Sequence, residues 1–334
     1  MARNKGIIAA TAAGIRGAFT KKAEPLDLDT DLSGRRCLVT GANSGLGKGI
    51  AVRLAAQGAH VTMAGRTMDE QAREDIVRVS ENHAVSLKKL DLASFESVLA
   101  FVESLRGAAP FDVVVLNAAV MNAKSVTTVD GLDEMTQVNF LSNVLLLESM
   151  LAEGLVNGTG QEAARIVVVS SEAHRWSEGI DLITLGEPTG FGMTQAMGHY
   201  SDTKFLMAAY VAHLARRLAA DEIAVHALCP GAVNSNLARQ APTFLKPLLK
   251  AVFTLFFASP MKASRPVFHL TASPRLAGRT GVYFHLAEEK AIDARAASPD
   301  FGAALFTRAT EVINRALSTK PLSAPRPLPW CTSG

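Results

Sequence analysis

The chain has 334 residues, of which 48% are hydrophobic and 19% are charged, and its formal net charge is +3. This composition is typical of a globular protein with a sizeable core and excludes an intrinsically disordered chain. The small positive charge, without runs of basic and aromatic residues, gives no reason to expect a nucleic-acid partner. Three cysteines, Cys37, Cys229 and Cys331, lie far apart, so we expect buried thiols and no metal site.

The N-terminal stretch mixes basic residues such as Arg3 and Lys5 with isolated apolar ones. A secretory signal would need an unbroken apolar region, which Gly14 and Arg16 interrupt. Two interpretations stay open: a basic amphipathic helix on a membrane surface, or a frayed extension. No stretch has the ~20 apolar residues of a spanning helix. We therefore expect a cytoplasmic protein, with peripheral membrane contact as an open alternative.

Short apolar runs alternate along the chain with longer stretches of helical periodicity. The predicted strands cover residues 36–40, 60–64, 85–92, 112–116, 165–169, 224–228 and 281–286. The clearest helices cover residues 48–57, 132–151 and 200–219. This alternation predicts a single α/β domain of Rossmann-like, doubly wound type, with about seven parallel strands and helices on both faces. We expect an extension over residues 1–33, a catalytic domain over 34–320 and a loose tail over 321–334.

A glycine-rich turn, Thr40-Gly-Ala-Asn-Ser-Gly-Leu-Gly47, follows the first predicted strand and leads into a helix. Glycine lets the backbone approach a pyrophosphate, and the helix N-terminus supplies free N–H groups. A tight turn also needs glycine for structural reasons, but the position after the first strand favours dinucleotide binding. The residues expected to contact the dinucleotide are Gly41, Ser44, Gly45, Leu46 and Gly47.

The end of the second predicted strand bears on which dinucleotide binds. Gly65 stands where an acidic residue would hold the ribose hydroxyls of NAD, and Arg66 follows it. A guanidinium can bind a 2′-phosphate through two N–H groups, although an ordinary exposed arginine is the structural alternative. The missing carboxylate and the arginine together predict NADP(H), with NAD(H) less favoured.

Tyr200 and Lys204 lie four residues apart at the start of a predicted helix, so they project from one face. A free phenol has a pKa near ~10, and a neighbouring ammonium should lower it. Such a phenol can give a proton to a carbonyl oxygen or take one from an alcohol. The YxxxK pattern is common by chance, so its weight depends on its neighbours.

Two further polar sites lie near the expected sheet edge. The fifth predicted strand ends in Ser170-Ser171, where ligands of parallel sheets bind and a hydroxyl can hold a substrate oxygen. Asn139 lies inside a predicted helix, where asparagine is a poor helix former. A solvent-facing polar side chain is its structural alternative.

These motifs occur in an order that resembles the short-chain dehydrogenase/reductase family. The glycine spacing differs from the G-x-G-x-x-G fingerprint and is similar to that family's TGxxxGxG. The resemblance is dense from about Arg35 to Ala238, loose to about residue 315, and greatest to the retinol-dehydrogenase and protochlorophyllide-reductase-like group. The matching motifs are TGANSGLG, Asp91-Leu92, Asn117-Ala118-Ala119, Asn139, VSS, YSDTK and Pro230-Gly231.

The resemblance implies a role for each reacting residue. Tyr200 would transfer the proton, and Ser171, preferred over Ser170, would hold the substrate oxygen. Lys204 would tune Tyr200 and bind the nicotinamide ribose, and Asn139 would bind a water that joins the lysine to solvent. Further cofactor contacts are implied for Asp91, Leu92, Asn117, Ala118, Pro230, Gly231 and Val233. The chain departs from the family after Pro230-Gly231, where the usual threonine is missing and Ser235 is a candidate replacement.

The resemblance implies an oxidoreductase that moves hydride between nicotinamide and a carbonyl or alcohol carbon. A catalytically silent dinucleotide-binding regulator or scaffold is the alternative from another class, and loss of Tyr200, Lys204 or Ser171 would have marked it. A sugar epimerase of the same fold is a second alternative. The glycine spacing and the lack of a separate C-terminal substrate domain argue against it.

An apolar segment over residues 244–259 follows the Pro230-Gly231 motif. Phe253, Phe256 and Phe257 share one helical face, while Lys246 and Lys250 are spaced to share another. We interpret the segment as a lid for a lipophilic aldehyde, ketone, retinoid-like or steroid-like substrate, able to touch a membrane. Packing on the sheet or a homo-oligomer contact is an equally open interpretation.

Overall fold

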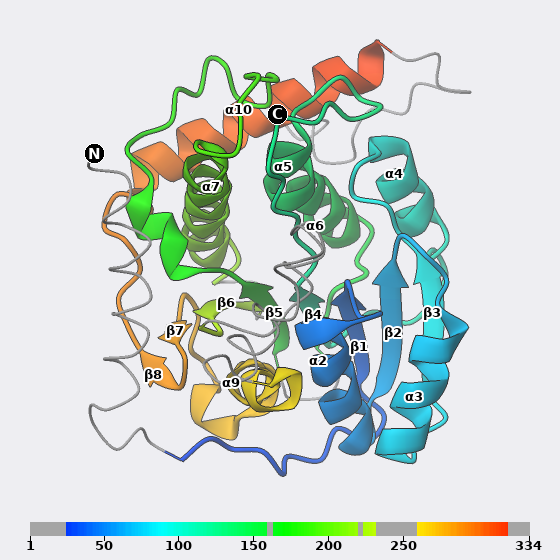
Figure 1. Ribbon diagram of the computed structural model, residues 1–334. Helices are drawn as coiled ribbons and strands as arrows, with labels where there is room; N and C mark the ends of the chain where they lie inside the picture. The colour runs from blue at the N-terminus through cyan, green and yellow to red at the C-terminus, as the bar shows by residue number, and fades with distance from the viewer. Residues whose placement is uncertain (1–24, 159–162, 220–222, 232–258, 320–334) are drawn as a thin grey trace, which may run out of the picture.

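The computed structural model describes residues 25–158, 163–219, 223–231 and 259–319 (Figure 1). Its centre is one eight-stranded sheet with the order β3-β2-β1-β4-β5-β6-β7-β8. Only the β7–β8 pair is antiparallel among these neighbours. The strands are β1 (Arg36–Thr40), β2 (His60–Gly65), β3 (Val85–Lys89), β4 (Val113–Leu116), β5 (Ala164–Val169), β6 (Ile223–Cys229), β7 (Tyr283–His285) and β8 (Glu288–Glu289).

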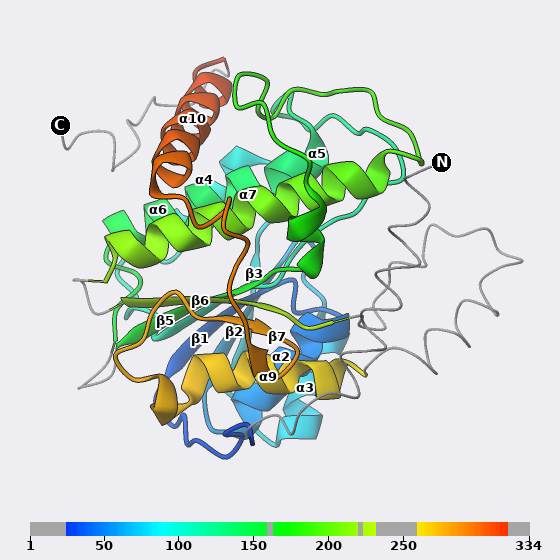
Figure 2. The ribbon, with the colours of Figure 1, turned by 90° about the vertical axis from the view of Figure 1, so that its left-hand side faces the viewer.

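Helices cover both faces of the sheet, as Figure 2 shows. One face carries α2 (Gly45–Ala56), α3 (Glu70–Ser80) and α9 (Pro260–Ala272). The other carries α4 (Phe95–Glu103), α6 (Ser142–Ala152) and α7 (Ala196–Arg217), with α10 (Pro299–Ser318) packed outside α7. Neighbouring residues of β5 illustrate why the strands are almost wholly apolar: Ile166 and Val168 enter one core, and Val167 enters the other.

The predicted doubly wound fold is confirmed, with one strand more than the seven expected. The extra strand, β8, has only two residues, both exposed glutamates, so it has no hydrophobic pattern that sequence could reveal. The long helix expected over residues 132–151 is also divided. It consists of α5 (Glu134–Thr136), a π-helical turn η1 (Gln137–Leu141) and α6. Such turns are rare within helices and frequently mark functional sites.

Residues 25–33 lie against α9 and its C-terminal end. The Asp27 amide donates to Nδ1 of His269 at 3.0 Å, and the Asp27 carboxylate pairs with Arg275 at 3.0 Å. Leu32 is buried in the core beneath α2 and α9. Within the part of the chain that the structure describes, no helix is both long and apolar enough to cross a membrane.

Several expectations fall outside the described residues. They concern the N-terminal stretch before residue 25, Val233 and Ser235, the apolar segment up to residue 258, and the C-terminal tail from residue 320. The predictions made for these segments therefore stay predictions.

Candidate active site

The glycine turn between β1 and α2 has room only for glycine at its critical positions. Gly41 has a φ of +69°, which other residues rarely adopt. A Cβ on Gly47 would lie 2.3 Å from the Gly41 oxygen and 2.5 Å from Nδ2 of Asn117. Gly45 also has a positive φ, of +56°, but a Cβ there would meet nothing within 4 Å. The turn is thus closely packed at Gly47 and open at Gly45. We call residues 40–47 the glycine cradle, whose open side fits the pyrophosphate of a dinucleotide.

Thr40 and Asn117 fix the back of this cradle. The Thr40 hydroxyl accepts from the backbone N–H groups of Asn117 and Ala118, each at 3.0 Å. The Asn117 side chain in turn donates to the Thr40 carbonyl at 2.9 Å. The backbone N–H and the side-chain amide of Asn117 thus both donate to Thr40 and hold the turn in shape. Thr40 begins the glycine motif, but sequence reasoning assigned it no contact, because its partners Asn117 and Ala118 lie far along the chain.

The other predicted cofactor residues lie at the ends of β2 and β3. Arg66 is exposed directly after β2. Asn43 packs behind Gly65 and donates to the Thr67 carbonyl at 2.7 Å, which ties the glycine turn to the Arg66 segment. Asp91 is partly exposed and accepts from the Ala93 amide, whereas the side chain of Leu92 lies in the hydrophobic core.

Ser171, Tyr200 and Lys204 come together at the C-terminal edge of the sheet. Ser171 follows β5, and the other two residues lie in the first turns of α7. The Ser171 hydroxyl lies near the Tyr200 phenol and acts to lower the pKa of that phenol. Nζ of Lys204 lies 5.5 Å from the centre of the Tyr200 ring and donates to the Val169 carbonyl at 3.2 Å. The structure thus groups a hydroxyl, a phenol and an ammonium from two separate elements.

The expected lowering of the Tyr200 pKa is not what the structure shows. Burial raises the pKa of Tyr200 above its ordinary value, and the nearby Ser171 hydroxyl opposes this rise only in part. Burial also lowers the pKa of Lys204 to about 8. Both shifts have one cause, because removal from water disfavours the charged form of each group. Tyr200 is therefore a protonated donor at neutral pH, beside a lysine that is still mostly charged.

The two serines at the end of β5 differ in environment. Ser170 is buried, and its hydroxyl has no hydrogen-bond partner among the described residues. Ser171 is partly exposed, and its Oγ accepts from the Ala173 amide at 3.2 Å at the start of the short helix η2 (Glu172–Trp176). Ser171 is therefore the more exposed of the two serines, and its contact with a substrate stays a prediction.

Asn139 is buried in the π-helical turn, so the alternative of a solvent-facing side chain is wrong. Its Oδ1 accepts from the Val120 amide at 2.8 Å, and its Nδ2 donates to the Val120 carbonyl at 2.8 Å and to Thr203 Oγ1 at 3.1 Å. The side chain thus joins the segment after β4 to the residue preceding Lys204. Its role in holding water stays a prediction.

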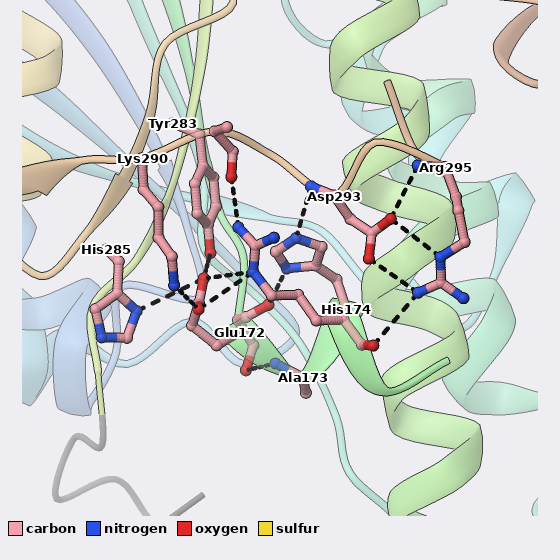
Figure 3. A network of polar contacts seen from close by, with 11 residues as sticks. Glu172, Ala173, His174, Tyr283, His285, Lys290, Asp293 and Arg295 are labelled. Atoms are coloured by element: carbon pink, nitrogen blue, oxygen red, sulfur yellow. Dashed lines mark hydrogen bonds and ion pairs between the residues drawn. The ribbon is translucent and has the colours of Figure 1, made fainter. Parts of the chain in front are cut away.

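The remaining predicted residues, Pro230 and Gly231, lie directly after β6. Gly231 has a φ of +75°, and a Cβ there would lie 2.4 Å from Cδ2 of Leu286, so the chain turns closely against the segment after β7. Sequence reasoning missed Glu172, whose carboxylate accepts from Oη of Tyr283 at 2.8 Å and from Nζ of Lys290 (Figure 3). These partners lie more than a hundred residues away, so no local pattern could reveal them.

Comparisons with known proteins agree with this geometry. The family model described as short chain dehydrogenase matches residues 35–180. Retinol dehydrogenase 14 of Mus musculus is 32% identical over 268 residues, which cover 76% of this chain and 78% of that protein. Retinol dehydrogenase 13 of Homo sapiens is 33% identical over 267 residues, which cover 78% of each chain.

Solved structures share the fold. A protein from Mycobacterium paratuberculosis matches with a TM-score of 0.65 at 25% identity, covering 85% of this chain and 95% of that one. The complex of Pseudomonas aeruginosa RhlG with NADP matches with a TM-score of 0.60 at 21% identity, covering 78% of this chain and 98% of that one. The extent and identity of the retinol dehydrogenase matches show that the chain belongs to the short-chain dehydrogenase/reductase family of oxidoreductases, which act on CH–OH and C=O groups.

Proposed function

We propose that this protein is an NADP(H)-dependent oxidoreductase that interconverts a carbonyl and an alcohol on a lipophilic substrate. The observation that carries the proposal is the grouping of the Ser171 hydroxyl, the Tyr200 phenol and the Lys204 ammonium at the sheet edge that also holds the glycine cradle. A silent dinucleotide-binding protein would not need this arrangement.

The bound dinucleotide would supply or accept hydride. Gly41, Gly45 and Gly47 would receive its pyrophosphate. Tyr200 would donate its phenolic proton to the carbonyl oxygen during reduction, because burial keeps the phenol protonated. Ser171 would hold the same oxygen through its hydroxyl, and the positive charge of Lys204 would stabilise the phenolate as the proton leaves.

The preference for NADP(H) rests on the end of β2. Gly65 places no carboxylate there, and the exposed Arg66 is free to meet a 2′-phosphate from solvent. NAD(H) would bind the same cradle but would lose this charge-assisted contact.

The lipophilic substrate rests on two observations. The described wall beside Tyr200 is an apolar cluster of Met135, Phe191 and Ala196 with Val120 packed against it. The apolar sequence over residues 244–258 supplies further candidates for the lid. Names of similar proteins, the retinol dehydrogenases, point the same way. We further propose a cytoplasmic protein that touches membranes peripherally through this segment and the N-terminal extension, residues 1–33, and that can self-associate.

The purified protein should be assayed for oxidation of NADPH and NADH with small aldehydes, long-chain aldehydes, retinal and steroid ketones. We expect turnover with NADPH and a rise in kcat/KM with substrate lipophilicity. Phe256→Ser should raise KM for the large carbonyls and hardly for the small ones. Dinucleotide binding without turnover of any of these carbonyls would favour the regulator.

A further inference from the structure

His174 occupies an unusual place directly beyond the candidate catalytic serine. Its side chain is fully buried in η2. Nδ1 lies 2.7 Å from the Ser171 carbonyl oxygen, and Nε2 lies 3.4 Å from the Asp293 amide nitrogen (Figure 3). Because the amide can only donate, Nε2 accepts and Nδ1 carries the proton that is donated to Ser171. These two contacts therefore define one neutral tautomer.

The contact with Ser171 acts on the residue that faces Tyr200. The Ser171 carbonyl receives a second bond from the His174 backbone amide at 3.1 Å, and Ser171 Oγ accepts from the Ala173 amide. The serine is thus fixed on its carbonyl and hydroxyl sides at once, in an extended conformation with a φ of −154°. A shift of this peptide would turn the hydroxyl away from the phenol.

A segment from the C-terminal part of the chain holds η2 in place from outside. Tyr283 donates to Glu172, and its ring meets that of His174 edge-on with the centres 5.3 Å apart. At the other end of η2, Nη1 of Arg295 donates to the Ser177 carbonyl at 2.6 Å, while the same guanidinium pairs with Asp293. Residues 283–295, which we term the clasp, therefore fasten both ends of the turn that carries Ser171.

We propose that His174, supported by the clasp, is a positioning residue that orients the Ser171 hydroxyl toward Tyr200. This inference rests on the proposed function, since it assigns Ser171 to the substrate oxygen. If His174 only filled space in the core, its two ring nitrogens would not both need to contact backbone groups, one of them on Ser171.

The first test compares His174→Asn with His174→Leu. The two side chains have the same branching and similar size, but only asparagine can donate from the position of Nδ1. We expect His174→Leu to lower kcat about 10- to 100-fold through misplacement of Ser171, with the Kd for NADPH unchanged. His174→Asn should recover most of the loss. Equal kcat values for the two variants would refute the role assigned to the hydrogen bond.

A double-mutant cycle separates positioning from general structural damage. If His174 acts through Ser171, then His174→Leu should cost no further activity, within about twofold, in a Ser171→Ala background. If the fold-losses of the two single variants multiply in the double variant, His174 works independently of Ser171 and the proposal is overturned.

Hydrogen–deuterium exchange supplies a readout that needs no turnover. His174→Leu should speed exchange of the amides in residues 172–176, and His174→Asn should leave it near wild type. Unchanged exchange in the leucine variant would reject the proposal, whereas absence of wild-type turnover would reject only the proposed function. Should His174→Leu fail to fold, Tyr283→Phe removes the bond to Glu172 and keeps the ring. It should lower kcat in the wild-type but not in the Ser171→Ala background, and equal losses in both would count against the clasp.

Discussion

The two halves of the sheet hold their functional residues in different ways. Around β1, β2 and β4, the glycine cradle is fixed by short contacts between neighbouring strand ends, such as those of Thr40 with Asn117. Around β5, β6 and β7, Ser171 is fixed by a turn whose partners, Tyr283 and Asp293, follow it by more than a hundred residues. We therefore expect substitutions of residues that contact the cofactor at the cradle to change cofactor binding alone. Substitutions in the turn that holds Ser171, or in its partners, should change both stability and turnover.

The largest effect should follow from Tyr200→Phe in the catalytic half. General acid catalysis is typically worth about 10²–10⁴ in rate, so kcat should fall by that factor while NADPH still binds. Stopped-flow or steady-state oxidation of NADPH, with binding followed by cofactor fluorescence, measures both quantities. Retention of more than about a tenth of kcat would contradict the assigned proton transfer.

Arg66→Ala should alter the cradle half alone. Loss of a charge-assisted hydrogen bond costs about 1.5–3 kcal/mol, so NADPH should bind roughly 10- to 150-fold more weakly and NADH should bind as before. Titration of both dinucleotides provides the comparison, and the melting temperature should not move. Equal weakening of both would mean that Arg66 does not contact the 2′-phosphate.

The pH dependence of carbonyl reduction should show the titration of the buried Lys204. Because burial lowers the pKa of Lys204 to about 8, its positive charge is lost as the pH rises through that value. Tyr200, with its raised pKa, stays protonated over the same range. We expect kcat/KM to fall up to about tenfold per pH unit above pH 8. Lys204→Arg should be slower, but its kcat/KM should not fall above pH 8. The same fall in that variant would mean that a group other than Lys204 titrates.

Glu172→Gln should show the smallest effect, a loss of stability that depends on pH. Burial would raise the pKa of Glu172, but the ion pair with His285 and the hydrogen bonds from Lys290 and Tyr283 outweigh it, so the pKa lies below its ordinary value. Its stabilising contribution is thus present above the ordinary carboxyl pKa and is lost as the pH falls. His285, whose interactions with Cys229 and Glu172 raise its pKa to about 9, contributes at low pH and loses that contribution as the pH rises through about 9.

The variant should therefore lose about 1–3 kcal/mol of stability near neutral pH, and less toward both extremes. Thermal melts at acid, neutral and alkaline pH measure the difference from wild type. Glu70→Gln is the matched control, because Glu70 pairs with Arg73 on an exposed helix face where such pairs contribute little. A pH-independent difference would mean that the charge of Glu172 is unimportant.

The sequence by itself predicted seven of the eight strands in their order and located three of the helices, because buried parallel strands are near-continuous apolar runs and helices have their own period. It also predicted which residues meet at the sheet edge. The ends of β1, β4 and β5 follow local motifs, and the geometry of a parallel sheet places those ends together. Tyr200 and Lys204 share a face because of helical spacing alone.

Tertiary structure decided what those residues experience. The Tyr200 pKa is raised because the phenol is buried, which residue spacing does not reveal. Asn139 lies buried in a π-helical turn and links the segment after β4 to α7, although its sequence predicted a regular helix. The clasp contacts Glu172 and His174 only because the folded chain brings these distant segments together. Motifs are local because backbone geometry is local, whereas solvation and side-chain partners are set by whatever the fold brings from far along the chain.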